Sequence, residues 1–264
     1  LLILWLRHCG IEPSLYIPDR ITEGYGPNIN AFTKLAKKNT LLLCLDSGTQ
    51  AFESVEAANK ENCDVIIIDH HQVNQNIPKS FALINPKRKN EDPNFFDLCT
   101  AGLVFLFLAD LNRISREDNK KEFNLINCMD LVALATMADV VPLNGLNRAF
   151  VHQGIRTISK NKRPCFEALA EQANFRSPIT DQALAFTFAP RINAAGRISD
   201  AKLATKLLTT KNLSDAEKYA NKLETLNMER KNLEQSVLDS ALLQAKIQQE
   251  SGANILWMFE KGWH

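Results

Sequence analysis

Short apolar runs alternate with helical patterns along the first two-thirds of the chain, and this alternation limits the fold more than any other feature. Residues 40–45, 65–68 and 82–84 are nearly continuous apolar runs, which is typical of strands buried on both faces. A further short strand is expected at 14–17. The helices are expected at 1–9, 31–38, 50–62, 101–112 and 125–138. Strands that alternate with helices predict an α/β fold, with a parallel sheet and helices on both faces.

The last third of the chain has a different character, with long helical patterns. A helix is expected to be capped at Thr180 and to run towards residue 188, and residues 193–196 (NAAG) are expected to form a loop. Residues 214–250 contain neither glycine nor proline and begin with SDAE, which fits a capping box. They form one very long helix or two helices broken near Asn227. A polar helix of this length is typical of a connector, and residues 253–259 look like the first strand of a second domain.

Both ends of the chain look cut. The sequence starts with Leu1 rather than methionine, inside an apolar run, and it stops at His264, just after the last expected strand. We therefore expect a fragment in which residues 1–212 form the main α/β domain. Residues 213–251 are expected to form a connector helix, and residues 252–264 the start of a further domain.

Composition leaves the function open. The chain has 31 basic and 30 acidic residues, and its net charge of +1 neither supports nor excludes nucleic-acid binding, for which a local groove is enough. No apolar run approaches the roughly 20 residues that cross a bilayer, and the start of the chain does not resemble a signal peptide. The six cysteines are scattered without a CxxC pair, which is typical of buried free thiols in a reducing compartment. We therefore expect a cytoplasmic protein without membrane association.

Polar residues directly follow two of the expected strands. Asp46 comes after the first apolar run, and Asp69, His70 and His71 come immediately after the second. In an open parallel sheet, ligands bind beyond the carboxyl ends of the strands, so both groups are expected to face one crevice. Carboxylate and imidazole ligands together suit Mn²⁺, or Mg²⁺ with more oxygen ligands. The lack of thiolates argues against structural zinc.

The two histidines are expected to have different roles. Adjacent side chains of an extended segment point to opposite sides, so one of His70 and His71 would bind metal and the other would face substrate or donate a proton. Asp69 could orient a histidine from behind. Asp139, which ends the apolar helix at 125–138, is the third candidate ligand. For that residue alone, an exposed helix-end aspartate is the plainer interpretation.

Taken together, these residues resemble the DHH phosphoesterase superfamily. Asp46, the triplet at 69–71 and residues 138–142 (ADVVP) match its second, third and fourth motifs in order. The chain is more closely similar to the RecJ-type single-strand-specific DNA exonucleases of that superfamily. The segments that carry this closer similarity are 16–20 (YIPDR), 23–26 (EGYG), 84–88 (INPKR), 189–197 (APRINAAGR) and 262–264 (GWH). The similarity covers essentially the whole chain, and the stretch from 189 to 197 is its most specific part.

The resemblance implies a hydrolase that degrades single-stranded DNA from the 5′ end with two divalent ions, Mn²⁺ or Mg²⁺. It implies that the metal ligands are Asp46, His70 and Asp139, whose side chains should then converge. The implied catalytic residues are His71, which would contact the scissile phosphate or help to protonate the leaving group, and Asp69 behind it. The candidate substrate-binding residues, which would line one groove, are Arg20, Arg191, Asn193 and Arg197. For each arginine, a salt bridge within the protein is the alternative.

Two parts of the family pattern have no counterpart in this sequence. The first motif, an aspartate-rich loop that supplies metal ligands, would lie before Leu1, and the body of the DHH-associated domain would lie after His264. The fragment is therefore expected to fold at least in part and to show little or no nuclease activity.

The resemblance also implies partners and leaves two alternatives open. We expect a monomer that binds single-stranded DNA in DNA repair and recombination, with a single-stranded-DNA-binding protein and a helicase as candidate partners. One alternative is another DHH phosphoesterase, which acts on short oligonucleotides, cyclic dinucleotides or pyrophosphate. The other is a non-catalytic DNA-binding relative, which would need none of the metal ligands.

Overall fold

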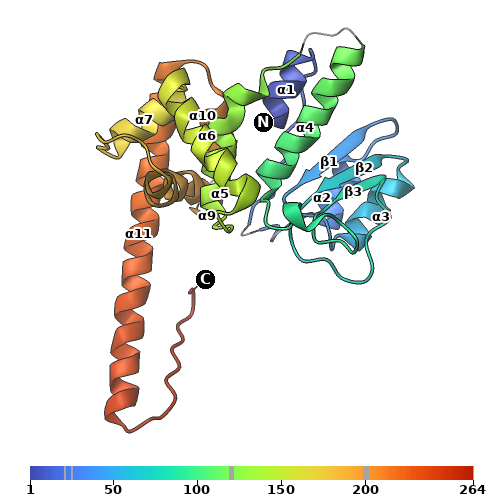
Figure 1. Ribbon diagram of the computed structural model, residues 1–264. Coiled ribbons are helices and arrows are strands. Elements are labelled where there is room, and N and C mark those ends of the chain that lie inside the picture. Colours follow the sequence, from blue (N-terminus) through green and yellow to red (C-terminus); the bar gives the residue numbers. More distant parts are fainter. Residues whose placement is uncertain (21, 25, 119–121, 199–201, 264) are drawn as a thin grey trace.

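The computed structural model describes residues 1–20, 22–24, 26–118, 122–198 and 202–263. These residues form a parallel sheet covered by helices, next to a helical part from which one long helix projects (Figure 1). The strands are β1 (Leu41–Leu45), β2 (Asp64–Ile68) and β3 (Ala82–Ile84). The helices beside the sheet are α1 (Leu2–His8), α2 (Ile29–Leu35), α3 (Phe52–Lys60), the 3-10 helix η1 (Pro93–Phe95) and α4 (Thr100–Glu117). The remaining helices are the 3-10 helix η2 (Leu125–Cys128), α5 (Met129–Ala138), α6 (Gly145–Asn161), α7 (Pro164–Gln172), α8 (Asp181–Ala183), the π-helix η3 (Leu184–Phe188), α9 (Ala189–Ile198), α10 (Lys202–Thr209) and α11 (Leu213–Glu250).

The three strands are parallel and in the order β1-β2-β3, so the predicted α/β fold with a parallel sheet is confirmed. The last residues of the strands are in register: Leu45 pairs with Ile68, and Ile68 pairs with Ile84. The residues that follow the three strands therefore leave the sheet side by side at one edge. This register brings together Asp46, the triplet at 69–71 and the start of the loop after β3.

Helices cover both faces of the sheet, as predicted. Val65 and Ile67 of β2 pack in one cluster with side chains of α2 and α3, whereas Ile66 and Ile68 pack in another with side chains of α1 and α4. Successive side chains of a strand point to opposite faces, so an unbroken apolar run is what a strand between two helical layers needs.

The helical part has its own core, built from α5 to α10 and the first half of α11. Leu184, Phe188, Leu207 and Leu223 are fully buried in it. Figure 1 shows α11 continuing as one helix out of this part, without a break at Asn227, which is fully buried. The expected capping box at 214–217 is wrong, because the side chain of Asn212 caps the helix by accepting from the Asp215 N–H at 3.1 Å.

Three further expectations differ from the structure. Residues 14–17 and 253–259 are not strands, and among the described residues neither segment has a strand beside it. Without a neighbouring strand, an apolar segment cannot form the backbone hydrogen bonds of a sheet. Residues 193–196 are helical rather than a loop and belong to α9, because Ala194 and Ala195 are fully buried against the helical core.

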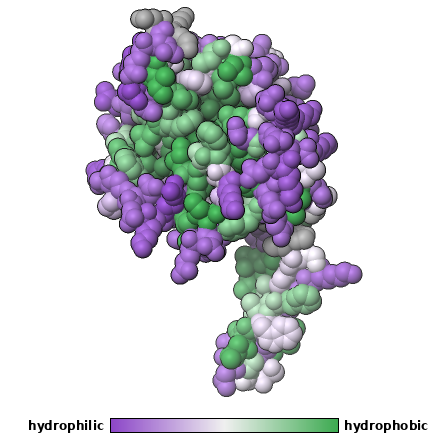
Figure 2. All heavy atoms as spheres, turned by 90° about the vertical axis from the view of Figure 1, so that its right-hand side faces the viewer, coloured by the Kyte–Doolittle hydropathy of each residue, from purple (hydrophilic) through white to green (hydrophobic). Residues whose placement is uncertain are grey.

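The outer half of α11 and the segment after it carry exposed apolar side chains. Figure 2 shows apolar side chains on the projecting end of the molecule and across one face of the body. On α11 the exposed apolar residues include Leu233, Leu238, Leu242 and Leu243, and residues 255–259 are exposed as well. This segment runs back beside α11, where the Trp257 N–H donates to the Gln248 side chain at 3.1 Å. None of the helices in the described ranges has the length and apolar character needed to cross a membrane.

Candidate metal centre

Asp46 is placed by a sharp turn at the end of β1. Its φ is 59°, in the left-handed region that aspartate tolerates better than most residues, and its N–H donates to the Ile68 carbonyl at 3.0 Å. Gly48 follows with a φ of 110°, and a Cβ there would lie only 2.9 Å from the Cys44 Sγ. The turn therefore needs glycine at this position. It holds a largely exposed Asp46 carboxylate at the edge of the sheet.

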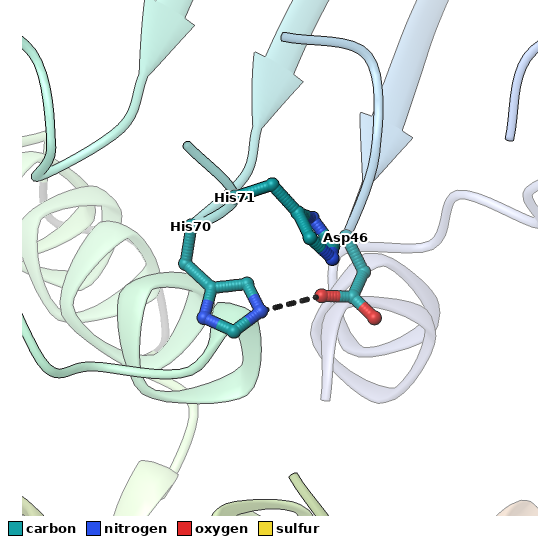
Figure 3. Close-up of side chains that lie close together, drawn as sticks. All are labelled: Asp46, His70 and His71. Atoms are coloured by element: carbon teal, nitrogen blue, oxygen red, sulfur yellow. Dashed lines mark ion pairs between the residues drawn. The ribbon is translucent and has the colours of Figure 1, made fainter. Parts of the chain in front are cut away.

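Side chains from three separate elements meet at this edge. The His70 Nε2 lies 3.5 Å from a carboxylate oxygen of Asp46 and 3.4 Å from one of Asp139. Figure 3 shows His70, from the loop after β2, and Asp46, from the turn after β1, pointing toward each other. Asp139 comes directly after α5, which ends where the sequence predicts. Because both carboxylates approach the same nitrogen, the structure brings together the three residues that the sequence predicts as metal ligands.

The two histidines share one side of the site. Ligand atoms of Asp46, His70 and His71 all lie within 4.8 Å of one another, and the centroids of the two imidazole rings are 4.8 Å apart. The expectation that His70 and His71 point to opposite sides is therefore wrong. The physical reason is that β2 ends at Ile68. Residues 69–71 form a loop, so their side chains do not alternate between two faces as they would in a strand.

Asp69 is buried behind the histidines and organises their loop. Its Oδ1 accepts hydrogen bonds from the backbone N–H groups of His70 and His71 at 2.8 and 3.2 Å, and it lies 2.7 Å from the His71 Nδ1. Its Oδ2 accepts from the backbone N–H and the hydroxyl of Thr49 at 3.1 and 2.6 Å. A carboxylate can only accept, so the His71 proton belongs on Nδ1 and Nε2 is left for the site.

The carboxyl groups of Asp69 and Asp139 have pKa values shifted in opposite directions. Burial would raise the pKa of the Asp69 carboxyl, but hydrogen bonds from Thr49 and His71 outweigh burial and hold that pKa below its ordinary value. Burial raises the pKa of the Asp139 carboxyl; His70 acts against this rise, and the charge of Asp46 adds to it. Asp69 is therefore a satisfied carboxylate, whereas Asp139 is one that a nearby cation would stabilise.

Two buried residues of the site were missed by the sequence reasoning. Thr49 is 1% exposed and Asn85 is 2% exposed. The Asn85 Nδ2 donates to the Thr49 hydroxyl and to the His71 carbonyl, both at 3.0 Å. The two residues thus fix the Asp69 carboxylate and the loop that carries both histidines. The available signal was their position, because each follows the carboxyl end of an apolar strand.

The donor set fits a divalent cation. The converging atoms are carboxylate oxygens and imidazole nitrogens, and among the described side chains no thiol belongs to the group that could hold an ion. Asp46 and Asp139 bring two negative charges to one nitrogen of His70, and the two carboxylates repel each other unless a cation lies between them. Oxygen and imidazole ligands of this kind suit Mn²⁺ and, with more oxygen ligands, Mg²⁺.

The four predicted substrate-binding residues have different surroundings. Arg191 is 9% exposed; its guanidinium forms an ion pair with Glu224 of α11 and donates to the Thr187 carbonyl at 2.6 Å. It therefore holds α9 against α11, as the salt-bridge alternative expects, and its contact with substrate stays a prediction. Asn193 is exposed on the wall of a pocket beside α5. The side chain of Arg197 lies outside the described residues.

Arg20, the remaining candidate, is an exposed residue of the segment that leads to α2. Glu23 shapes this segment by accepting hydrogen bonds from the Tyr16 hydroxyl, from the Asp19 N–H at 3.2 Å and from the Asn28 side chain at 3.1 Å. The hydrogen bond from Tyr16 is the main cause that lowers the pKa of the Glu23 carboxyl. Whether Arg20 and Asn193 contact substrate stays a prediction.

Comparison with protein families and curated sequences gives consistent matches. A family model described as "DHH family, N-terminal domain" matches residues 1–136. The curated relatives include the single-stranded-DNA-specific exonuclease RecJ of Salmonella typhimurium, which is 33% identical over 277 residues that cover 99% of this chain and 48% of the relative. RecJ of Bacillus subtilis is 30% identical over 262 residues, which cover 98% of this chain and 32% of that protein. The chain thus spans about half or less of the length of these relatives.

Solved structures agree with the sequence matches. A crystal structure of an exonuclease RecJ bound to manganese superposes with a TM-score of 0.81 at 29% identity, over 92% of this chain and 61% of that one. The structure of RecJ from Thermus thermophilus in complex with Mn²⁺ gives a TM-score of 0.74 at 28% identity, over 92% of this chain and 35% of that one. The fold described above is therefore shared with proteins crystallised with a divalent ion.

Proposed function

Because the chain belongs to the DHH family, we propose that it forms the metal-binding part of an exonuclease that hydrolyses phosphodiester bonds of single-stranded DNA. The observation that carries this proposal is the approach of Asp46 and Asp139 to the same nitrogen of His70, within 3.5 Å. Similarity to proteins named single-stranded-DNA-specific exonucleases supports the substrate. On this proposal residues 1–212 form the DHH domain, 213–251 the connector helix, and 252–264 the start of the DHH-associated domain.

In this proposal Asp46, His70 and Asp139 hold divalent ions, Mn²⁺ or Mg²⁺. A pair of such ions activates water and stabilises the negative charge that develops on the phosphate. The protein's own contribution is to set two carboxylates and one imidazole at the rigid edge of the sheet. The turn that carries Asp46 is fixed by Gly48 and by the hydrogen bond from the Asp46 N–H to the Ile68 carbonyl.

His71 is proposed to act on the substrate. Its Nδ1 is bound to Asp69 at 2.7 Å, so Nε2 is the atom that faces outward, and the side chain is 60% exposed. From this position the imidazolium form, which carries a proton on both nitrogens, would contact the scissile phosphate or hand its Nε2 proton to the leaving oxygen. Asp69 itself is a positioning residue, because it is 1% exposed and its oxygens are taken up by Thr49 and the histidine loop.

The biological setting follows from the same proposal. We place the protein in the cytoplasm, in DNA repair and recombination, as a monomer that digests single strands in the 5′ to 3′ direction. A single-stranded-DNA-binding protein and a helicase would then deliver its substrate.

A hydrolysis assay tests the proposal. The protein translated from its complete gene is incubated with Mn²⁺ and three substrates: a long 5′-phosphorylated single strand, a dinucleotide and a cyclic dinucleotide. Release of mononucleotides from the long strand is expected, and Asp46→Asn and His70→Ala should each abolish it. The matched control is Asp110→Asn, an exposed aspartate of α4 that pairs with Arg113.

The same assay separates the alternatives. Digestion of the short or cyclic substrates alone would indicate another DHH phosphoesterase. Binding of the long strand without any hydrolysis would indicate a non-catalytic relative. Mn²⁺-dependent hydrolysis that survives in both Asp46→Asn and His70→Ala would show that the metal centre lies elsewhere.

A further inference from the structure

An open, mostly apolar pocket lies beside the candidate metal centre. Its volume is about 470 Å³, and its walls come from the end of α5, from η3, from α9 and from α11. Ala138 and Val140, the residues on either side of Asp139 in the chain, both line it. A group bound in this pocket would therefore be the immediate neighbour of a group bound at Asp139.

Phe186 stands out on the pocket wall because it is aromatic and 80% exposed. It belongs to the π-helix η3, in which Leu184 and Phe188 are fully buried. π-Helical turns are rare and occur often at functional sites, since the wider turn changes the direction of a side chain. Here the local structure keeps two side chains in the core and presents the ring between them to solvent.

Val140, which also lines the pocket, is a second unusual feature. It is 87% exposed and has a φ of 58°, a conformation that is strained for a β-branched residue. Strained backbone is found preferentially at binding and catalytic sites, where the surrounding structure maintains it. The polar groups at the pocket are few, and they include the Asn193 side chain and Arg230.

We propose that this pocket binds a nucleobase of the single strand whose phosphate lies at the metal centre, with the base stacked on Phe186. This inference rests on the proposed function and adds a base-binding subsite to it. An apolar wall with an exposed ring accepts every base, because every base has an aromatic face. A nuclease that must pass along a strand of any sequence needs such a contact. A paired base could not enter, so the subsite also selects single strands.

The experiment measures binding, with no hydrolysis. Fluorescence anisotropy is recorded for the protein with 5′-phosphorylated single strands in EDTA, with an abasic residue placed in turn at each of the first six nucleotides. For the wild-type protein, one abasic position is expected to weaken binding about fivefold to a hundredfold, the range for one stacked base. Phe186→Ala should weaken binding of the intact strand and remove the effect of that abasic position, and Phe186→Trp should restore both.

The matched control is Phe81→Ala, which removes a similarly exposed ring, 73% exposed, just before β3. It should leave the affinity and the abasic pattern unchanged. Because both rings lie at the surface, neither substitution should change the free energy of unfolding, which urea denaturation checks.

The outcomes separate this inference from the proposed function. A wild-type protein that binds the intact and abasic strands equally, or an abasic effect that persists in Phe186→Ala, would overturn the base subsite and leave the nuclease proposal standing. A wild-type protein that binds no single strand would also overturn the base subsite, and the proposed function is then judged by the hydrolysis assay with Mn²⁺.

Discussion

The Thr49 hydroxyl is the most informative single group to remove, because it tests how the histidine loop is held. It is buried, donates to the Asp69 Oδ2 at 2.6 Å and accepts from the Asn85 side chain at 3.0 Å. Thr49→Val keeps the shape of the side chain and deletes only this hydroxyl. A hydrogen bond to a charged group contributes about 1.5–3 kcal/mol. Since Asn85 keeps its bond to the His71 carbonyl, we expect the free energy of unfolding to fall by about 2–3 kcal/mol at pH 7.

Thr49→Ser is the matched control, because it keeps the hydroxyl and loses only a methyl group. Burial of one such group is worth about 0.8 kcal/mol. The serine variant should therefore be more stable than the valine variant by at least about 1 kcal/mol. Urea denaturation in EDTA measures all three proteins.

The pH dependence gives a second check on the same bond. The folded protein holds the pKa of Asp69 below its ordinary value, so this carboxylate contributes stability above that value and loses it as the pH falls through the folded pKa. Thr49→Val weakens one cause of the low pKa. The gap between wild type and variant should therefore be full at pH 7 and shrink as the pH falls below about 4. A gap that widens at low pH, or a serine variant as unstable as the valine variant, would refute this account of the loop.

Three further predictions address the turn after β1 and the packing of the helical part. Arg191→Ala leaves the Glu224 carboxylate without its buried partner, so urea denaturation should show the free energy of unfolding lowered by about 3 kcal/mol. A loss below about 1 kcal/mol would mean that the pair does not stabilise the packing of α9 on α11. Gly48→Ala should lower the free energy of unfolding by about 2 kcal/mol or more, because φ is 110° and the added Cβ would lie 2.9 Å from the Cys44 sulfur. An unchanged unfolding curve would contradict the described turn. Burial raises the pKa of the Cys165 thiol to about 12. At pH 8 a thiol reagent should therefore label the exposed Cys9 and leave Cys165 unmodified until the protein unfolds. Labelling of both thiols at equal rates would show that Cys165 is accessible.

The sheet and its edge were predictable from the sequence because both depend on local patterns. The apolar runs at 40–45, 65–68 and 82–84 form the three strands, and the polar residues that follow them meet where parallel strands end. Asp46 and His70 therefore lie together as expected.

The errors arose where the conformation depends on distant partners. An apolar segment such as 14–17 becomes a strand only beside another strand, and its own residues carry no information about that neighbour. The ion pair of Arg191 could not be assigned from the sequence either, because Glu224 lies 33 positions away along the chain. Thr49 and Asn85 belong to no charged motif, and their roles become visible only through the hydrogen bonds that they make with Asp69 and His71.

Binding of Mn²⁺ to the purified protein tests the central claim most directly. Electron paramagnetic resonance of free Mn²⁺ is recorded during a titration of the wild type, of Asp139→Asn and of the control Asp110→Asn. Loss of one ligand is expected to weaken binding at least about tenfold in Asp139→Asn, since even residues behind the ligands have effects of this size. The control should bind as the wild type does. Equal affinity in Asp139→Asn and wild type would contradict a metal centre built from Asp46, His70 and Asp139.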